Sequence, residues 1–180
     1  GQRFDASGAT VGPEFQINTG TNNQQGSSSV TALSDGGFVV SWESYLTGGF
    51  EQIGSSLGIF GQRYDAAGEV VGVEFQINTT ADQWQEMSNV EALAGGGFVV
   101  TWSTLGDDGT NYNIFGQRYD VAGAADGAEF QVNTTANDDQ WVSTTAGLTD
   151  GGFVVTWTSN NQDGDGYGIY GQRYDAAGAA

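Results

Sequence analysis

The stretch "DGGFVVTW" at 150–157 decides the fold, because close copies of it stand at 35–42 and at 95–102. In "VTALSDGGFVVSW" at 30–42, apolar residues alternate with small or polar ones on both sides of an Asp-Gly-Gly turn. This pattern is typical of a β-hairpin whose glycines adopt positive φ. The sequence therefore predicts a chain built from repeated hairpins.

Other landmarks return with the same period. "GQR" begins at 1, 61, 116 and 171, so the copies are spaced by 60 and then 55 residues. The extra residues of the first interval fall within "ESYLTGGFEQIGSSLG" at 43–58, which we predict to be a loop that tolerates insertion. The repeats form a single domain, 1–180, with units of about 1–60, 61–115 and 116–170 and a redundant strand at 171–180.

Each unit is predicted to contain four strands, because a second hairpin follows the first. The chain has 30 glycines and one proline, which favours short strands joined by tight turns. We predict an all-β fold of three four-stranded antiparallel repeats, similar to a β-propeller, with a β-trefoil and a linear β-solenoid as alternatives. Equivalent apolar positions in the three units form the expected core: Leu33, Leu93 and Leu148; Trp42, Trp102 and Trp157; Phe15, Phe75 and Phe130.

The order of strands predicts an unpaired edge. The chain starts at the third strand of one unit and finishes on that same strand, so one "GQRYD" strand is redundant. An exposed strand edge attracts another strand. Self-association, head to tail, or contact with neighbouring repeats of a longer chain is therefore expected.

Composition excludes several classes of partner and chemistry. The 180 residues carry 22 acidic side chains, four arginines and no lysine, a net charge of -18 that repels nucleic acid and anionic membrane surfaces. No apolar run is long enough for membrane insertion. Cysteine and histidine are absent, which removes disulfides, thiol nucleophiles and histidine-based catalysis. The side chains that remain available for catalysis are carboxylates, hydroxyls and tyrosines.

A pair of carboxylates is the remaining route to hydrolysis, as in glycosidases. Nearly every acidic residue, however, is either repeated with the framework, as Glu14, Glu74 and Glu129 are, or lies in an expected flexible loop. An active site usually breaks the symmetry of a repeat. The sequence therefore predicts no catalytic residues and no enzymatic activity.

The only basic residues are one arginine in each copy of the "GQR" motif. They could form a ring that grips an anion. A structural role is favoured, in which each arginine pairs with a carboxylate such as Asp65 or Glu74 or their equivalents. The four arginines are Arg3, Arg63, Arg118 and Arg173.

Two loop features suggest ligands. Asn161, Asp163 and Asp165 alternate in "NQDGDG" at 161–166, like the first half of a calcium loop, although no glutamate follows at the twelfth position. This predicts a Ca²⁺ site, and a solvated turn rich in Asp and Gly is the alternative. A sugar site is suggested by aligned glutamines beside tryptophans, with further loop aromatics Tyr45, Phe50, Tyr112 and Tyr167. The residues of the sugar site are Trp84, Trp141, Gln85 and Gln140.

The combined pattern "DGGFVVTW…GIYGQRYDAAG…EFQVNT" resembles tandem repeats of large secreted or surface proteins of proteobacteria, of the RTX type or adhesin-like. The resemblance implies a secreted or cell-surface location, and the high acid content suits a saline or calcium-rich exterior, where counterions screen self-repulsion. The resemblance also implies a non-enzymatic structural or adhesive module. A carbohydrate-binding, lectin-like module that uses the loop aromatics, with a glycan as partner, is the alternative.

Overall fold

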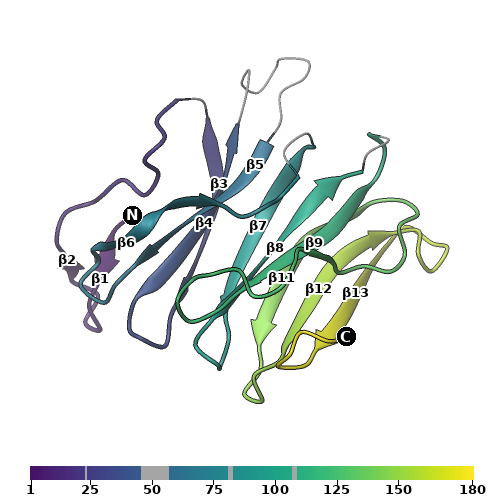
Figure 1. Cartoon of the computed structure of the whole chain (residues 1–180). Helices are drawn as coiled ribbons and strands as arrows, with labels where there is room; N and C mark the ends of the chain where they lie inside the picture. Colours follow the sequence, from purple (N-terminus) through teal and green to yellow (C-terminus); the bar gives the residue numbers. More distant parts are fainter. Residues whose placement is uncertain (23, 46–56, 81–82, 107–108) are drawn as a thin grey trace.

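A computed structural model describes residues 1–22, 24–45, 57–80, 83–106 and 109–180. Over these residues the chain forms thirteen strands in antiparallel sheets, and Figure 1 shows that the sheets lie side by side in a row. The all-β, propeller-like prediction is confirmed. Within these ranges no helix is long and apolar enough to cross a membrane.

Three of the sheets are stacked like propeller blades. Blade 1 consists of β3 (Gln25–Ala32), β4 (Phe38–Tyr45), β5 (Leu57–Tyr64) and β6 (Val70–Gln76). Blade 2 consists of β7 (Gln85–Ala92), β8 (Phe98–Leu105), β9 (Tyr112–Tyr119) and β10 (Phe130–Gln131). Blade 3 has three strands, β11 (Gln140–Gly147), β12 (Phe153–Asn160) and β13 (Tyr167–Tyr174).

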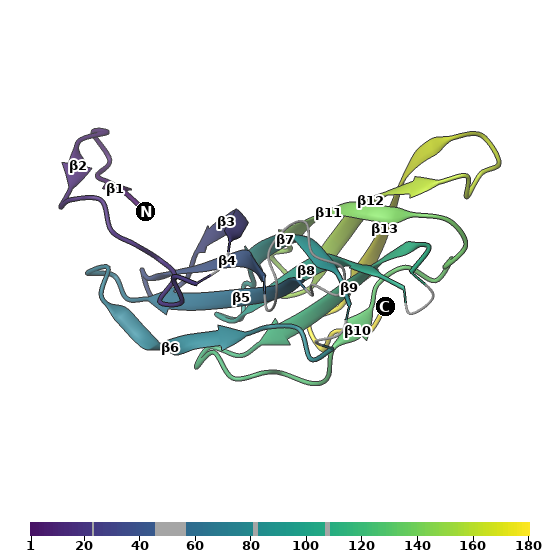
Figure 2. The same ribbon diagram turned by 90° about the horizontal axis from the view of Figure 1, so that it is seen from above.

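A short hairpin precedes the blades. It consists of β1 (Arg3–Phe4) and β2 (Thr10–Val11), which pair only with each other. In Figure 2 this hairpin lies at one end of the row of blades, and β13 lies at the other. β1 belongs to the "GQR" strand, which is the third strand of a blade, so the blades are shifted relative to the sequence units.

Most of the predicted core positions are buried, although Phe15, Phe75 and Phe130 are only half-buried. Trp42, Trp102 and Trp157 are 4%, 0% and 6% exposed. Leu33 and Leu93 are buried as well, whereas Leu148 is half-buried. Alternation places one face of each strand against the next sheet, which removes these side chains from water and stabilises the fold.

The predicted insertion loop is shorter than expected. Of the stretch 43–58, residues Glu43 to Tyr45 continue β4 and Leu57 and Gly58 begin β5. Tyr45 pairs with Leu57 and Glu43 with Ile59 in the antiparallel ladder. The period difference revealed where residues were inserted but not how far the strands extend. Residues 46–56, including Phe50, lie outside the described residues.

A β-bulge interrupts the first strand of every blade. The pairing register shifts between Gly26 and Ser29, and at the same positions of the other blades. Each bulge holds a non-glycine residue at positive φ: Ser27 at 49°, Met87 at 57° and Val142 at 55°. Bulges of this kind redirect side chains and recur next to active sites.

Aromatic rings join neighbouring blades by one repeated contact. Phe75 of blade 1 packs on Tyr119 of blade 2, which is stacked on Phe98 with ring centroids 4.7 Å apart. Phe130 of blade 2 packs in the same way on Phe153 and Tyr174 of blade 3. Phe15, at the start of the chain, packs on Phe38 and Tyr64 of blade 1.

The arginines also join neighbouring blades. Arg3 donates to the carbonyl oxygens of Ala66 and Ala67, in the turn after β5. The next two arginines reach the equivalent turns, Arg63 to the Val121 oxygen at 3.1 Å and Arg118 to the Ala176 oxygen at 3.0 Å. The structural role expected for the arginines fits these contacts.

The predicted carboxylate partners of the arginines are wrong. Arg63 faces Asp35 at 3.6 Å and Arg118 faces Asp126 at 2.8 Å, rather than Asp65 or Glu74. Asp65 instead accepts from the backbone of its own turn. Glu74 accepts hydrogen bonds from Thr19, and Glu129 accepts them from Thr79, so each links one repeat to the next.

Replacing Arg118 tests the role of these contacts. We expect Arg118→Met to lower the free energy of unfolding by about 1–3 kcal/mol, because it removes a charged hydrogen bond and an ion pair from a side chain that is 14% exposed. Arg118→Lys keeps the charge beside Asp126 and loses the planar guanidinium group. Its free energy of unfolding should therefore lie between those of the parent protein and Arg118→Met. Urea unfolding measures the difference. An unchanged midpoint for Arg118→Met would show that the contact is dispensable.

Candidate functional site

The two predicted glutamines lie inside the blades. Gln85 and Gln140 are both 0% exposed. The Gln140 side-chain oxygen accepts a hydrogen bond from the Trp157 indole N–H at 2.9 Å, and the Gln85 amide donates to the carbonyl oxygen of Thr80. These amides hold the ends of the strands in place, so the prediction that they face a ligand does not fit the structure.

The two predicted tryptophans belong to a row of aromatic residues along one edge of the blades. Trp84 is half-buried and packs edge-on against Tyr45, with ring centroids 5.8 Å apart. Trp141 is half-buried between Tyr112 and Tyr167, at 6.2 Å from each ring. We call these five residues the aromatic row. Tyr45 is only 9% exposed and lies on a strand, contrary to its predicted place on a loop.

The predicted calcium loop is a tight exposed turn. The Asn161 side-chain oxygen accepts from the Gly166 N–H, and Asp163 accepts from the Asp165 N–H, both at 3.2 Å. Across the ranges that the structure describes, no three acidic side chains group as metal ligands would. Calcium binding stays a prediction.

Glu43 lies at the end of β4, beside the bulge of the next blade. Its carboxylate accepts a hydrogen bond from the backbone N–H of Met87, the positive-φ residue of that bulge. Ser27, the equivalent residue of blade 1, also hydrogen-bonds this carboxylate. Burial raises the pKa of Glu43 above its usual value, and the nearby charge of Glu86 adds to the increase.

Glu86 is the second acid of the site, on β7 of blade 2. It accepts a hydrogen bond from the Trp84 indole N–H at 2.8 Å and another from the hydroxyl of Tyr112. Burial and the charge of Glu86 raise the pKa of Tyr112 to about 12, so this hydroxyl keeps its proton at neutral pH. Two members of the aromatic row therefore hold Glu86 in place.

Glu43 and Glu86 together form the candidate acid pair. Their side chains come from adjacent blades, and the charge of Glu86 helps to raise the pKa of Glu43. A half-buried acid with a raised pKa beside a second carboxylate is an arrangement in which the two groups can take the different roles of acid and base. The aromatic row, to which Tyr45 and Trp84 belong, borders the pair.

The sequence argument overlooked both acids, although a signal was present. Glu43 occupies the position of Ser103 and Thr158 in the other units, and Glu86 that of Gly26 and Trp141. Both thus break the symmetry of the repeat. Glu43 escaped notice because it fell within the expected loop at 43–58.

The raised pKa of Glu43 predicts how stability changes with pH. The folded state holds this proton more tightly than the unfolded state, so deprotonation lowers stability as pH rises from the ordinary value of 4.5 through the folded pKa. Glu43→Gln removes the titrating group, so the variant does not lose stability in this way as the pH rises. The variant should gain stability relative to the parent protein at about pH 7 and not at about pH 4, as measured by urea unfolding. An equal difference at both pH values would contradict the shift.

Comparison with known proteins places the fold among β-propeller-like structures. No protein-family model and no curated protein sequence matches the chain. Among solved structures, the chain is similar to the crystal structure of endo-arabinase from Bacteroides thetaiotaomicron VPI-5482, with a TM-score of 0.55 and 12% identity. The match covers 92% of this chain and 62% of that one. The chain thus spans less than two thirds of the endo-arabinase.

This comparison corrects the expected function. The sequence predicted a non-enzymatic structural or adhesive module, with a lectin-like module as the alternative, yet the similar structure is that of an enzyme. The sequence argument did not separate the acids that break the symmetry of the repeat from those that follow it. The resemblance to RTX-type or adhesin-like repeats, and the secreted location that it implies, stay predictions.

Proposed function

We propose that the protein is a glycoside hydrolase that cleaves a polysaccharide at the Glu43–Glu86 pair. The observation that carries the proposal is this pair of acids at the junction of two blades, bordered by the aromatic row. The similarity to an endo-arabinase supports the choice of reaction class. Aromatic rings provide flat faces on which sugar rings stack.

The two acids take different roles. Glu43, whose pKa is raised by burial, holds the proton that passes to the glycosidic oxygen as the bond breaks. The carboxylate of Glu86 takes a proton from a water molecule, whose oxygen then bonds to the anomeric carbon. Trp84 and Tyr112 fix Glu86 through hydrogen bonds, which keeps its carboxylate oriented during the reaction.

The charge of the chain limits the substrate. A net charge of -18 repels acidic polysaccharides, so a neutral polysaccharide is favoured. Arabinan is the first choice, because it is the substrate class that the name of the similar enzyme indicates. A polymer of this kind is met outside the cell, which agrees with the predicted secreted or cell-surface location.

The test is an assay for new reducing ends. The protein is incubated with linear arabinan, with other neutral polysaccharides and with polygalacturonate, and products are separated by size. Release of oligosaccharides from a neutral polymer, and none from polygalacturonate, is the expected result. Absence of products from every neutral polymer contradicts the proposal.

A further inference from the structure

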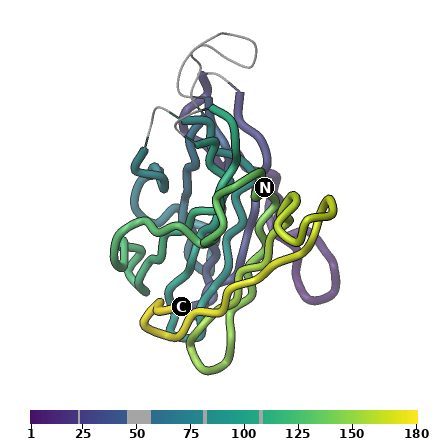
Figure 3. Tube along the Cα trace, turned by 90° about the vertical axis from the view of Figure 1, so that its right-hand side faces the viewer, coloured from purple at the N-terminus to yellow at the C-terminus, as the bar shows by residue number. Residues whose placement is uncertain are grey.

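The outer edge of β13 lacks the strand that covers its equivalents. In blades 1 and 2 the third strand is covered by a fourth, β6 on β5 and β10 on β9. Within the described residues no strand pairs with the outer edge of β13, which Figure 3 faces. No blade follows β13 within the described residues either: Ile169 is 76% exposed, whereas Ile59 and Ile114 at the same position are 0% exposed and pack in the cores between their own blade and the next.

On the same edge, the position that a phenylalanine ring occupies in the other blades is empty of any described residue. At Gly61 and Gly116 an added Cβ would lie 2.9 Å from the ring of Phe75 or Phe130, because the fourth strand lays its phenylalanine on this glycine. At Gly171 an added Cβ would meet only Thr156 and Val155, both at 3.3 Å. The edge of β13 thus has the shape of a strand that receives a fourth strand.

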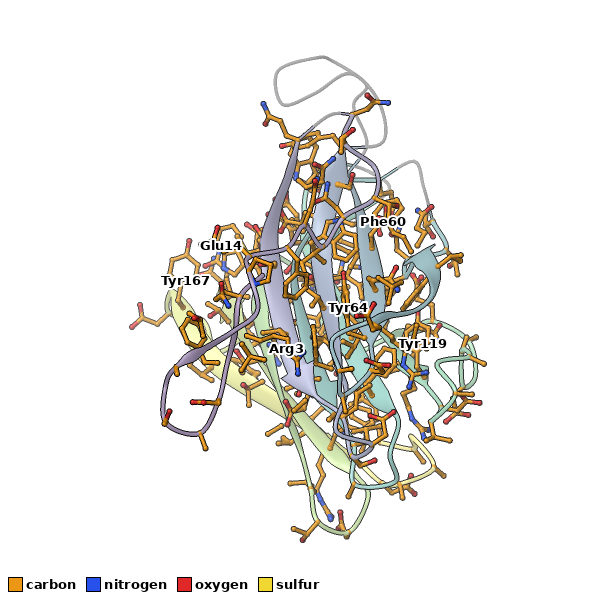
Figure 4. The ribbon with its side chains drawn as sticks, turned by 90° about the vertical axis from the view of Figure 1, so that its left-hand side faces the viewer. Arg3, Glu14, Phe60, Tyr64, Tyr119 and Tyr167 are labelled. Carbon is orange, nitrogen blue, oxygen red and sulfur yellow. The ribbon has the colours of Figure 1, made fainter. Side chains whose placement is uncertain are left out.

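The opposite end of the molecule carries a fourth-strand segment that is not part of a complete blade. Residues 9–17 are a fourth strand by sequence, and they pair only with the short β1: Arg3 lies opposite Val11, and the Phe15 N–H donates to the Gly1 oxygen at 2.9 Å. An added Cβ at Gly1 would lie 2.9 Å from the Phe15 ring, so Phe15 lies over Gly1 as Phe75 lies over Gly61. Figure 4 faces this end and labels Arg3 and Glu14.

The first blade also lacks a neighbour on this side. β7 packs on β3 and β4 of blade 1, and β11 packs on β7 and β8 of blade 2, but β3 has no complete blade before it. Val30 on β3 is therefore 65% exposed, whereas the equivalent Val90 is 2% exposed. A groove lined by Gly1, Phe15, Val30, Phe38 and Val40 marks the uncovered face.

The polar contacts between blades stop at the same two ends. Arg173 reaches no following turn and pairs with Asp150 of its own blade. Glu74 and Glu129 bind the threonine of the preceding repeat, but Glu14 makes no hydrogen bond or ion pair with any described residue. At the other end of the molecule, Thr134 occupies the position of Thr19 and Thr79. It is therefore the threonine that a further glutamate of this kind would bind.

We propose that a second copy of this chain completes blade 3, with its residues 9–17 as the fourth strand on β13. Phe15 of the second copy then covers Gly171, and its Glu14 reaches Thr134. Arg173 takes the place that Arg3 holds in the second copy, at the carbonyl oxygens of Ala66 and Ala67. Strand β13, which is anchored in a blade, replaces the two-residue β1, and blade 3 covers Val30.

The absence of cysteine allows a direct test by disulfide trapping. Since Arg3 faces Val11 within one chain, Arg173 of one copy would face Val11 of the other. The double variant Val11→Cys, Arg173→Cys should form covalent oligomers under mild oxidation. The control Val73→Cys, Arg173→Cys places the second thiol at a site that is 80% exposed and belongs to the complete blade 1. Equal cross-linking in both variants, or none in either, overturns the proposal.

A charge at Ile169 tests the interface without a cross-link. Ile169→Lys should be tolerated by a single chain, because this side chain is 76% exposed, but it would place an ammonium group in the core between β13 and blade 1 of the second copy. Light scattering should show the parent protein at twice the mass of one chain or more, and Ile169→Lys as a single chain. Val73→Lys should associate like the parent. A parent protein that stays a single chain up to about millimolar concentration overturns the proposal. Hydrolytic activity is measured separately, so failure of either proposal leaves the other standing.

Discussion

Gly97→Ala should lower the free energy of unfolding by about 2–4 kcal/mol. An added Cβ at Gly97 would lie well inside van der Waals contact with the backbone carbonyl oxygen of Tyr119 on the neighbouring strand. Backbone cannot rotate aside as a side chain does, so β8 and β9 would have to separate. Both strands contribute to the main core, around Phe98 and Trp102.

The same turn offers a matched control. Gly95 lies two residues away, and an added Cβ there meets no atom within 4 Å. Gly95→Ala should therefore leave stability nearly unchanged, although the chemical change is identical. Urea unfolding of both variants measures the difference between them. If both lose the same stability, the close approach of Gly97 to Tyr119 is not what holds the two strands together.

Glu43→Gln should reduce hydrolysis by about 10²–10⁴-fold, because the amide cannot deliver a proton to the glycosidic oxygen. The amide keeps the shape of the side chain, and its oxygen still accepts a hydrogen bond from the Met87 N–H. The substitution should therefore spare the fold while it removes the chemistry. Initial rates on the polysaccharide that the parent protein cleaves provide the measurement.

Two controls separate catalysis from structure. Glu74→Gln replaces an acid that binds Thr19 as part of the framework, and it should retain activity. The stability measurement adds a second readout, since Glu43→Gln should be more stable than the parent at about pH 7. A Glu43→Gln variant that is stable and still fully active would exclude Glu43 as the acid.

The fold was predictable because it repeats. Three copies of "GGFVV" and four of "GQR" fixed the strands, their hairpins and the buried tryptophans. The contacts between blades were not predictable in the same way. The sequence suggested a carboxylate partner for each arginine, but the contacts that reach the neighbouring blade are to backbone carbonyls such as those of Ala66 and Val121, which no side-chain pattern reveals.

The candidate site was missed for a related physical reason. Glu43 and Glu86 are far apart in sequence and belong to different blades, so only the stacking of the blades brings them together. The β-bulge that presents the Met87 N–H is equally hidden, because "QEMSN" at 85–89 carries no glycine to mark a positive φ. Regular strands were readable from alternation, whereas local departures from regularity were not.

The arginine contacts have a consequence for how such a chain can change over evolutionary time. Their acceptors are carbonyl oxygens, which every residue possesses, and the turns that carry them already differ, with alanine at 66 and 176 and valine at 121. A newly duplicated unit would find a docking point on its neighbour before any compensating mutation arose. Unit number can therefore vary while single units diverge, and one junction between two units can acquire acids that the others never carry.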